Sequence, residues 1–259
     1  MNISCEICAN DSFKSVYEKD SINVVKCSNC SALRLSDFNI GELSNHYSRK
    51  IKYTDRIDFE KVKKLSDLSE FIKKDSNTRL LDVGCGKGDY IRYLSSQNIN
   101  VEGLEPNPSF NIFYKNIPVS NNFIIDDLYK DNTFDIITLI QVLEHLDNPV
   151  QKLETLRRYL KPDGTIVINV PSYNNPRILL YRYFGFKSVV KKDFIKQHLY
   201  YYTPKTLSNV LNKSGFEVYR IECGRYNTKF GPNLIFKFID KICNSFGIGG
   251  IMAYAKKKI

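Results

Sequence analysis

The sequence predicts an α/β fold built around a parallel sheet, on three observations. Short apolar stretches of the length of buried strands begin at Leu80, Ile99 and Phe134. Amphipathic segments typical of helices separate them, and such alternation is typical of a parallel sheet whose site lies at the carboxyl ends of its strands. The 259 residues and 42% hydrophobic content fit one domain with a large core and a small additional module.

The first strand runs directly into a glycine-rich turn in the stretch Leu80–Tyr90, LLDVGCGKGDY. Asp82 lies in the apolar part, and Gly84, Gly86 and Gly88 precede an amphipathic helical segment. Strand, tight glycine turn and helix together bring a ligand against bare backbone. A generic glycine-rich turn remains the alternative for this stretch taken alone.

An acidic residue ends the second strand. Glu105 follows Gly84 by 21 residues and stands where an acid can accept both hydroxyls of a ribose. A dinucleotide-binding enzyme would favour G-x-G-x-x-G, but Asp89 occupies the third glycine position here.

The motifs LLDVGCGKGDY, Glu105, FDIITLIQVLEHL and LKPDGTIVINVP, in that order, resemble those of class I S-adenosylmethionine-dependent methyltransferases. The resemblance covers residues 78–225. It implies a Rossmann-like seven-stranded methyltransferase sheet and S-adenosylmethionine as the cofactor.

The resemblance also implies roles for the residues around the first two strands. Gly84, Gly86 and Gly88 would let the loop approach the methionine moiety and the ribose. Asp82 would brace that loop or receive the methionine ammonium through water, with a simple capping role as the alternative. Glu105 would hold the ribose diol.

Three further residues are implied on the adenine and substrate sides. Asp126 or Asp127 would accept a hydrogen bond from the adenine amino group, and one of the two would be solvent-exposed. Gln141, at the end of the fourth strand, would line the methionine or substrate side.

Three histidines are present, and two of them are candidate bases for methyl transfer. His198 resembles a histidine that serves as base in sugar C-methyltransferases, and it precedes a helix start at Thr203–Pro204. His145, expected to open the helix after the fourth strand, is the second candidate, with capping or packing as its alternative. We expect His46 at the surface or near a lid.

A catalytic divalent metal has weak support. Some quinone O-methyltransferases carry an acid three residues before a Glu-His pair, whereas Gln141 precedes Glu144 and His145 here. This difference argues against that metal site and against a quinone substrate.

Four of the seven cysteines form two C-x2-C pairs, Cys5 with Cys8 and Cys27 with Cys30, separated by 18 residues. Two such pairs can surround zinc, and four thiolates leave no open position, so the predicted zinc is structural. Disulfides or a chance pairing of cysteines are the alternatives, and reducing cytoplasm disfavours the first.

The predicted organisation is a zinc-binding ribbon module at 1–40, a helical linker or cap at 41–75, and a methyltransferase domain at 76–259. A lid insertion at about 172–203 is rich in aromatic and basic residues. This layout resembles bacterial sugar- and polysaccharide-tailoring methyltransferases.

The chain has a net charge of +10, which favours an anionic partner. We expect a small, sugar-type acceptor, either a nucleotide-sugar or a surface-polysaccharide precursor, methylated on oxygen. A sugar C-methyltransferase, or an RNA or protein methyltransferase that docks through the module and basic surface, is the alternative. Scattered lysines argue against nucleic acid. The sequence shows no transmembrane segment or signal peptide, predicts a cytoplasmic protein, and sets no oligomeric state.

Overall fold

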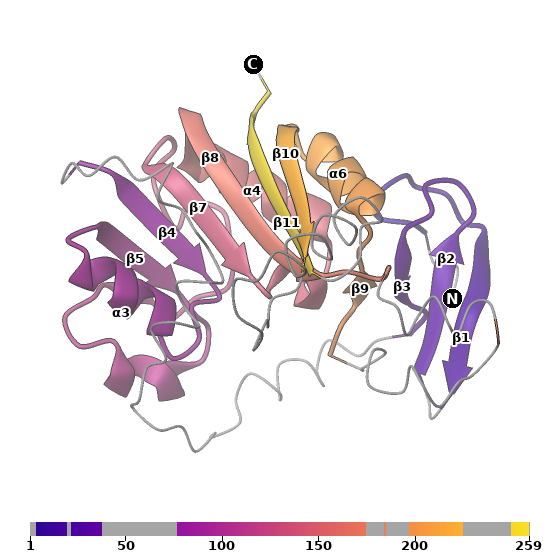
Figure 1. Cartoon of the computed structure of the whole chain (residues 1–259), viewed down its shortest axis with the longest axis horizontal. Coiled ribbons are helices and arrows are strands. Elements are labelled where there is room, and N and C mark those ends of the chain that lie inside the picture. Colours follow the sequence, from indigo (N-terminus) through magenta and orange to yellow (C-terminus); the bar gives the residue numbers. More distant parts are fainter. Residues whose placement is uncertain are drawn as a thin grey trace, which may run out of the picture.

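The computed structural model describes residues 4–19, 22–37, 77–174, 184, 197–224 and 250–258. The predicted linker at 41–75, His46 and most of the predicted lid lie outside this described part of the chain. Within it, two sheets lie side by side (Figure 1).

The larger sheet has seven strands in the order β10-β11-β8-β7-β4-β5-β6. Its strands are β4 (Arg79–Val83), β5 (Asn100–Leu104), β6 (Val119–Ser120), β7 (Phe134–Ile140), β8 (Leu160–Pro171), β10 (Phe216–Gly224) and β11 (Gly250–Lys257). The five strands from β8 to β6 run parallel, whereas β11 is antiparallel to both β8 and β10. The predicted seven-stranded Rossmann-like sheet is confirmed.

Each face of this sheet packs against its own helices. Helix α3 (Asp89–Ser96) and the 3-10 helix η1 (Pro108–Phe113) share one apolar cluster with alternate residues of the central strands. Helices α4 (Pro149–Tyr159) and α6 (Pro204–Lys213) share the cluster on the other face. Since strand side chains alternate between faces, the mostly buried strands have apolar residues on both sides.

The smaller sheet combines three N-terminal strands with one strand from near residue 200. Its order is β1-β2-β3-β9, with β1 (Phe13–Lys19), β2 (Ile22–Cys27), β3 (Leu33–Leu35) and β9 (Tyr200–Tyr201) all antiparallel to their neighbours. The N-terminal strands therefore share their sheet with a strand from the predicted methyltransferase part of the chain (Figure 1). Their core is continuous with the α4 and α6 side of the large sheet.

Two helix starts follow from local sequence. Thr203 caps α6 with the reciprocal hydrogen bonds of a capping box, and Pro204 occupies the first turn, as predicted. His145, in contrast, ends the short 3-10 helix η2 (Leu143–His145) and does not open the next helix. Helix α4 begins later because Asn148 caps it and Pro149 fills its first turn.

None of the helices in the described ranges has the length and apolar character needed to cross a membrane.

Candidate active site

The glycine loop after β4 has left-handed backbone at three positions, with φ of 67° at Gly84, 53° at Gly86 and 80° at Gly88. A Cβ on Gly84 would lie 2.5 Å from a methyl of Val142, whereas a Cβ on Gly86 would meet nothing within 4 Å. The tip of the loop is therefore open to a ligand while its base is packed. The Tyr114 hydroxyl donates a 2.7 Å hydrogen bond to the Gly86 carbonyl and holds this tip.

Glu105 follows β5 and reaches back to the same loop. Its carboxylate accepts hydrogen bonds from the backbone N–H of Gly86 at 3.0 Å and of Asn107 at 2.9 Å. The side chain is buried, and burial raises its pKa despite these two backbone donors. Each carboxylate oxygen keeps further acceptor capacity, which a ligand hydroxyl can use.

Asp82 lies inside the sheet below the glycine loop. Its carboxylate accepts a 2.6 Å hydrogen bond from the Thr138 hydroxyl of the neighbouring strand β7. Burial raises the pKa of Asp82 to about 7, the Thr138 hydrogen bond opposes this rise, and the charge of Glu105 adds to it. Two buried acids thus lie close together and favour a positively charged ligand group.

Two asparagines support this edge, and the sequence analysis did not select them. The Asn121 side-chain amide, just after β6, donates a 3.0 Å hydrogen bond to the Glu105 carbonyl. The Asn107 side chain caps η1 through the Ser109 N–H. Asn107 could have been identified from its sequence position two residues after Glu105, whereas no sequence signal marks Asn121.

Asp126 and Asp127 have other partners. Asp126 accepts hydrogen bonds from the Thr155 hydroxyl at 2.9 Å and from the Arg158 guanidinium at 3.4 Å. Asp127 accepts from the same Arg158 at 3.0 Å. Both aspartates are exposed. These contacts tie the loop after β6 to α4, while adenine contact by either aspartate stays a prediction.

Gln141 lies directly after β7, as expected, with left-handed backbone at φ 58°. Its side-chain amide donates a 2.6 Å hydrogen bond to the Asn169 side chain on β8. Its backbone N–H bonds to the Asn169 carbonyl at 2.9 Å. The exposed side chain is therefore fixed between the ends of two parallel strands.

The two candidate bases meet, although 52 residues separate them in the chain. Their rings pack edge to face with centroids 4.8 Å apart. The His145 Nδ1 is 2.7 Å from the Gln197 carbonyl, which assigns the proton to that nitrogen and leaves Nε2 as the acceptor. Burial, with a smaller effect of His145, lowers the pKa of His198 to about 4. His198 is therefore neutral at physiological pH.

Glu144 lies beneath this histidine pair and was not selected from sequence as a site residue. It is 1% exposed, and neither carboxylate oxygen has a hydrogen-bond partner on another described residue. Burial raises its pKa to about 8, so it holds a proton at neutral pH. One ligand atom from each of Glu144, His145 and His198 lies within 4.8 Å of the others.

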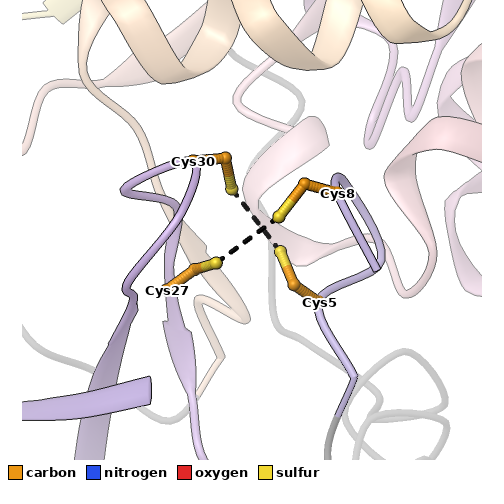
Figure 2. Close-up of side chains that lie close together, drawn as sticks. All are labelled: Cys5, Cys8, Cys27 and Cys30. Atoms are coloured by element: carbon orange, nitrogen blue, oxygen red, sulfur yellow. Dashed lines mark hydrogen bonds between the residues drawn. The ribbon is translucent and has the colours of Figure 1, made fainter. Parts of the chain in front are cut away.

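The four predicted cysteines converge on one point from two turns (Figure 2). The Cys5 and Cys30 sulfurs are 3.5 Å apart, as are those of Cys8 and Cys27. A disulfide requires a separation of about 2.0 Å, whereas tetrahedral zinc at about 2.3 Å from each sulfur sets neighbouring sulfurs about 3.8 Å apart. None of the four thiols forms a disulfide, and the distances between their sulfur atoms fit a bound zinc ion.

The two cysteine turns share one backbone feature. The residue after each pair, Ala9 after Cys8 and Ser31 after Cys30, has left-handed backbone with φ of 56° and 63°. Each turn also closes on its first cysteine, whose carbonyl accepts from Ala9 at 2.6 Å and from Ser31 at 3.1 Å respectively. This matched geometry turns both thiol pairs toward the same point.

Comparison with known proteins places the chain in a family. A family model described as "Methyltransferase domain" matches residues 53–221, which is more than half of the chain. The chain therefore belongs to this family. A ubiquinone biosynthesis O-methyltransferase from Rickettsia typhi is 30% identical over 101 residues, covering 36% of this chain and 41% of that protein. A tRNA U34 carboxymethyltransferase from Nautilia profundicola is 33% identical over 105 residues, covering 36% and 34% respectively.

This chain therefore spans about a third to two fifths of the length of the curated relatives it matches. A SAM-dependent methyltransferase of Thermotoga maritima, described as a possible histamine N-methyltransferase, shares the fold. That structure has a TM-score of 0.55 at 16% identity over 77% of this chain and 90% of its own. Fold and family together define a domain of the S-adenosylmethionine-dependent methyltransferase type.

The packing of the glycine loop predicts different effects of alanine at its base and at its tip. We expect Gly84→Ala to lower the free energy of unfolding by about 1–3 kcal/mol, because its Cβ would overlap Val142. The left-handed backbone at this position should lower it by about 1 kcal/mol more. Gly86→Ala should incur only the backbone cost and weaken cofactor binding, because its Cβ would enter the ligand space. Urea unfolding and calorimetry would check both effects, and equal losses of stability would contradict the difference.

Proposed function

We propose that this protein transfers the methyl group of S-adenosylmethionine to a hydroxyl oxygen of a small, anionic, sugar-type acceptor. The observation that carries the proposal is the contact between His145 and His198 beside the end of β7. In a doubly wound fold, ligands bind at the carboxyl ends of the strands. Here two imidazoles that can accept a proton in their neutral form lie at that edge of the sheet.

The residues around the glycine loop fit this cofactor. Glu105 offers its carboxylate to the ribose diol, and the open side of Gly86 leaves room for the ligand. Asp82 and Glu105 supply negative charge below a molecule that carries a sulfonium and an ammonium. When bound, the cofactor supplies an electrophilic methyl group, so the protein needs alignment and a proton acceptor.

His198 is the candidate base. A neutral imidazole is the form that can accept the proton of the acceptor hydroxyl, and the lowered pKa keeps His198 in that form. The Gln197 carbonyl orients His145, whose Nε2 is the second possible proton acceptor. The Tyr201 ring lies beside this base, with its centroid 6.1 Å from that of the His198 ring.

The acceptor class rests on two kinds of support. The curated relatives named ubiquinone O-methyltransferases favour oxygen as the methylated atom. The four-Cys module beside a methyltransferase domain resembles sugar-tailoring enzymes, and the net charge of +10 favours an anionic acceptor. A quinol and an RNA are the competing acceptors, the second because of the tRNA-modifying relative.

The four cysteines would hold a structural zinc ion. Four thiolates fill the tetrahedral shell, so this ion has no open position for substrate. Burial in a small module raises the pKa of Cys5, whereas hydrogen bonds lower the pKa of Cys27 to about 7 despite its burial. Zinc would keep all four thiols deprotonated and link the two cysteine turns.

A parallel acceptor screen tests the proposed function. The purified protein and S-adenosylmethionine would be incubated with nucleotide-sugars, polysaccharide precursors, ubiquinol-type catechols and bulk RNA, with release of S-adenosylhomocysteine as the readout. We expect release with a sugar acceptor, and mass spectrometry should place the methyl group on oxygen. Release with quinols or RNA alone would overturn the sugar acceptor.

The Glu105 contacts predict that Glu105→Gln weakens the binding of S-adenosylhomocysteine by about 10- to 100-fold, as for loss of a hydrogen bond to a charged group. Glu102→Gln is a matched control, because Glu102 lies on β5, the strand that Glu105 follows, and pairs with Arg79 away from the glycine loop. Titration calorimetry would measure both variants. Equal affinities would remove Glu105 from the proposed cofactor site.

We expect His198→Ala to lower kcat by about 10²- to 10⁴-fold while leaving cofactor affinity within a factor of two. In the unsubstituted enzyme, the acid limb of kcat/KM should lie well below pH 6.5, because the His198 pKa is lowered to about 4. If the acid limb of kcat/KM instead lies near pH 6.5 and disappears only in His145→Ala, His145 is the base.

A further inference from the structure

We propose that the four-Cys module is a clamp that holds the two histidine-bearing segments together, so that metal loading of the module sets the geometry of the methyl-acceptor site. This inference deepens the proposed function and rests on the role given there to His145 and His198. It is carried by two separate connections, one from each cysteine turn.

The first connection runs through the residue after His198. The Leu199 carbonyl accepts a 3.0 Å hydrogen bond from the backbone N–H of Leu35, at the end of β3. The Leu199 N–H donates a 2.8 Å hydrogen bond to the Glu144 carbonyl in η2. One residue therefore joins the module on one side to the His145-bearing turn on the other.

The pairing of β3 with β9 extends this connection. Leu33 and Arg34 stand opposite Tyr201 and Tyr200, in an antiparallel register. The Cys27–Cys30 turn directly precedes β3, and it closes through the Cys27 N–H to the Ala32 carbonyl at 2.8 Å. The position of this turn therefore determines the position of the strand that holds β9.

The second connection begins in the Cys5–Cys8 turn. Glu6, within that turn, lies 3.6 Å from the guanidinium of Arg34 on β3. The Asn148 backbone, three residues after His145, lies close enough to the Glu6 carboxylate to oppose the rise in the Glu6 pKa that burial causes. The first turn thus contacts the loop that follows η2, whereas the second turn contacts the segment around His198.

A metal ion is the element that would hold these two connections in a fixed relation. The two turns approach through sulfur pairs 3.5 Å apart, and thiol contacts at that distance are weak. Four metal–sulfur bonds would replace them and close a loop of 18 residues between Cys8 and Cys27. Loss of the metal would free β3 and the Cys5–Cys8 turn to move independently.

The test uses the full chain before and after zinc removal by a strong chelator, with zinc quantified per chain. The chain has three histidines, so imidazole-labelled protein gives a simple NMR spectrum. On chelation, we expect the His145 and His198 signals to shift and hydrogen exchange in 197–202 to accelerate at least tenfold. Affinity for S-adenosylhomocysteine should stay within twofold, and one equivalent of zinc should restore both signals.

A variant separates the clamp from general unfolding. Glu6→Ala leaves all four cysteines in place, so zinc content should be unchanged while exchange at Asn148 accelerates and the His145 signal shifts. Lys26→Ala, at an exposed position of β2, is the matched control and should change neither.

Unchanged histidine signals and exchange after zinc loss would overturn the clamp, as would the absence of zinc from the purified protein. Loss of cofactor affinity together with zinc would also overturn it, because the module would then support the whole domain. The proposed function fails differently, through absence of methyl transfer to every acceptor by zinc-loaded protein whose histidine signals respond as expected.

Discussion

The backbone of Leu199 is the connection on which the candidate acceptor site depends. It accepts a hydrogen bond from β3 of the cysteine module and donates one to Glu144, which precedes His145. A backbone group removed from water must find a partner, and here both partners come from distant parts of the chain. Both hydrogen bonds of Leu199 therefore require that β3 and η2 pack on either side of the segment that carries His198.

The cofactor side depends on a different constraint, the burial of acidic groups at the carboxyl ends of the strands. Asp82 and Glu105 both have raised pKa values, because burial disfavours their charged forms. A cation placed above them would recover part of this free energy by favouring the ionised carboxylates. The open glycine loop and the buried acids thus both fit the proposed cofactor, which is a positively charged nucleoside derivative.

The sequence predicted the parts of the site that depend on local pattern. The strand, glycine turn and helix around Gly86, the acid at Glu105 and the two C-x2-C pairs are each encoded within short stretches. The parallel sheet followed from the alternation of these stretches with helices.

Features that depend on contacts between distant segments could not be predicted. The pairing of β3 with β9 joins residues more than 160 positions apart, and neither strand is longer than three residues. The two-residue strand β6 is too short to show a pattern. Arg158 pairs with Asp126 and Asp127 from a helix later in the chain, so their sequence position alone did not reveal these partners.

Glu144 places a buried, protonated carboxyl group beside the two histidines of the proposed acceptor site. At neutral pH the Glu144 carboxyl is protonated and His198 is neutral, so neither of these two groups carries a charge before reaction. A proton accepted by His198 would create a positive charge within a few ångströms of the Glu144 carboxyl. That charge would favour ionisation of Glu144, because an opposite charge nearby lowers the pKa of a buried acid. A buried acid with a raised pKa is therefore suited to stabilise the imidazolium without opposing the neutral form that must first accept the proton.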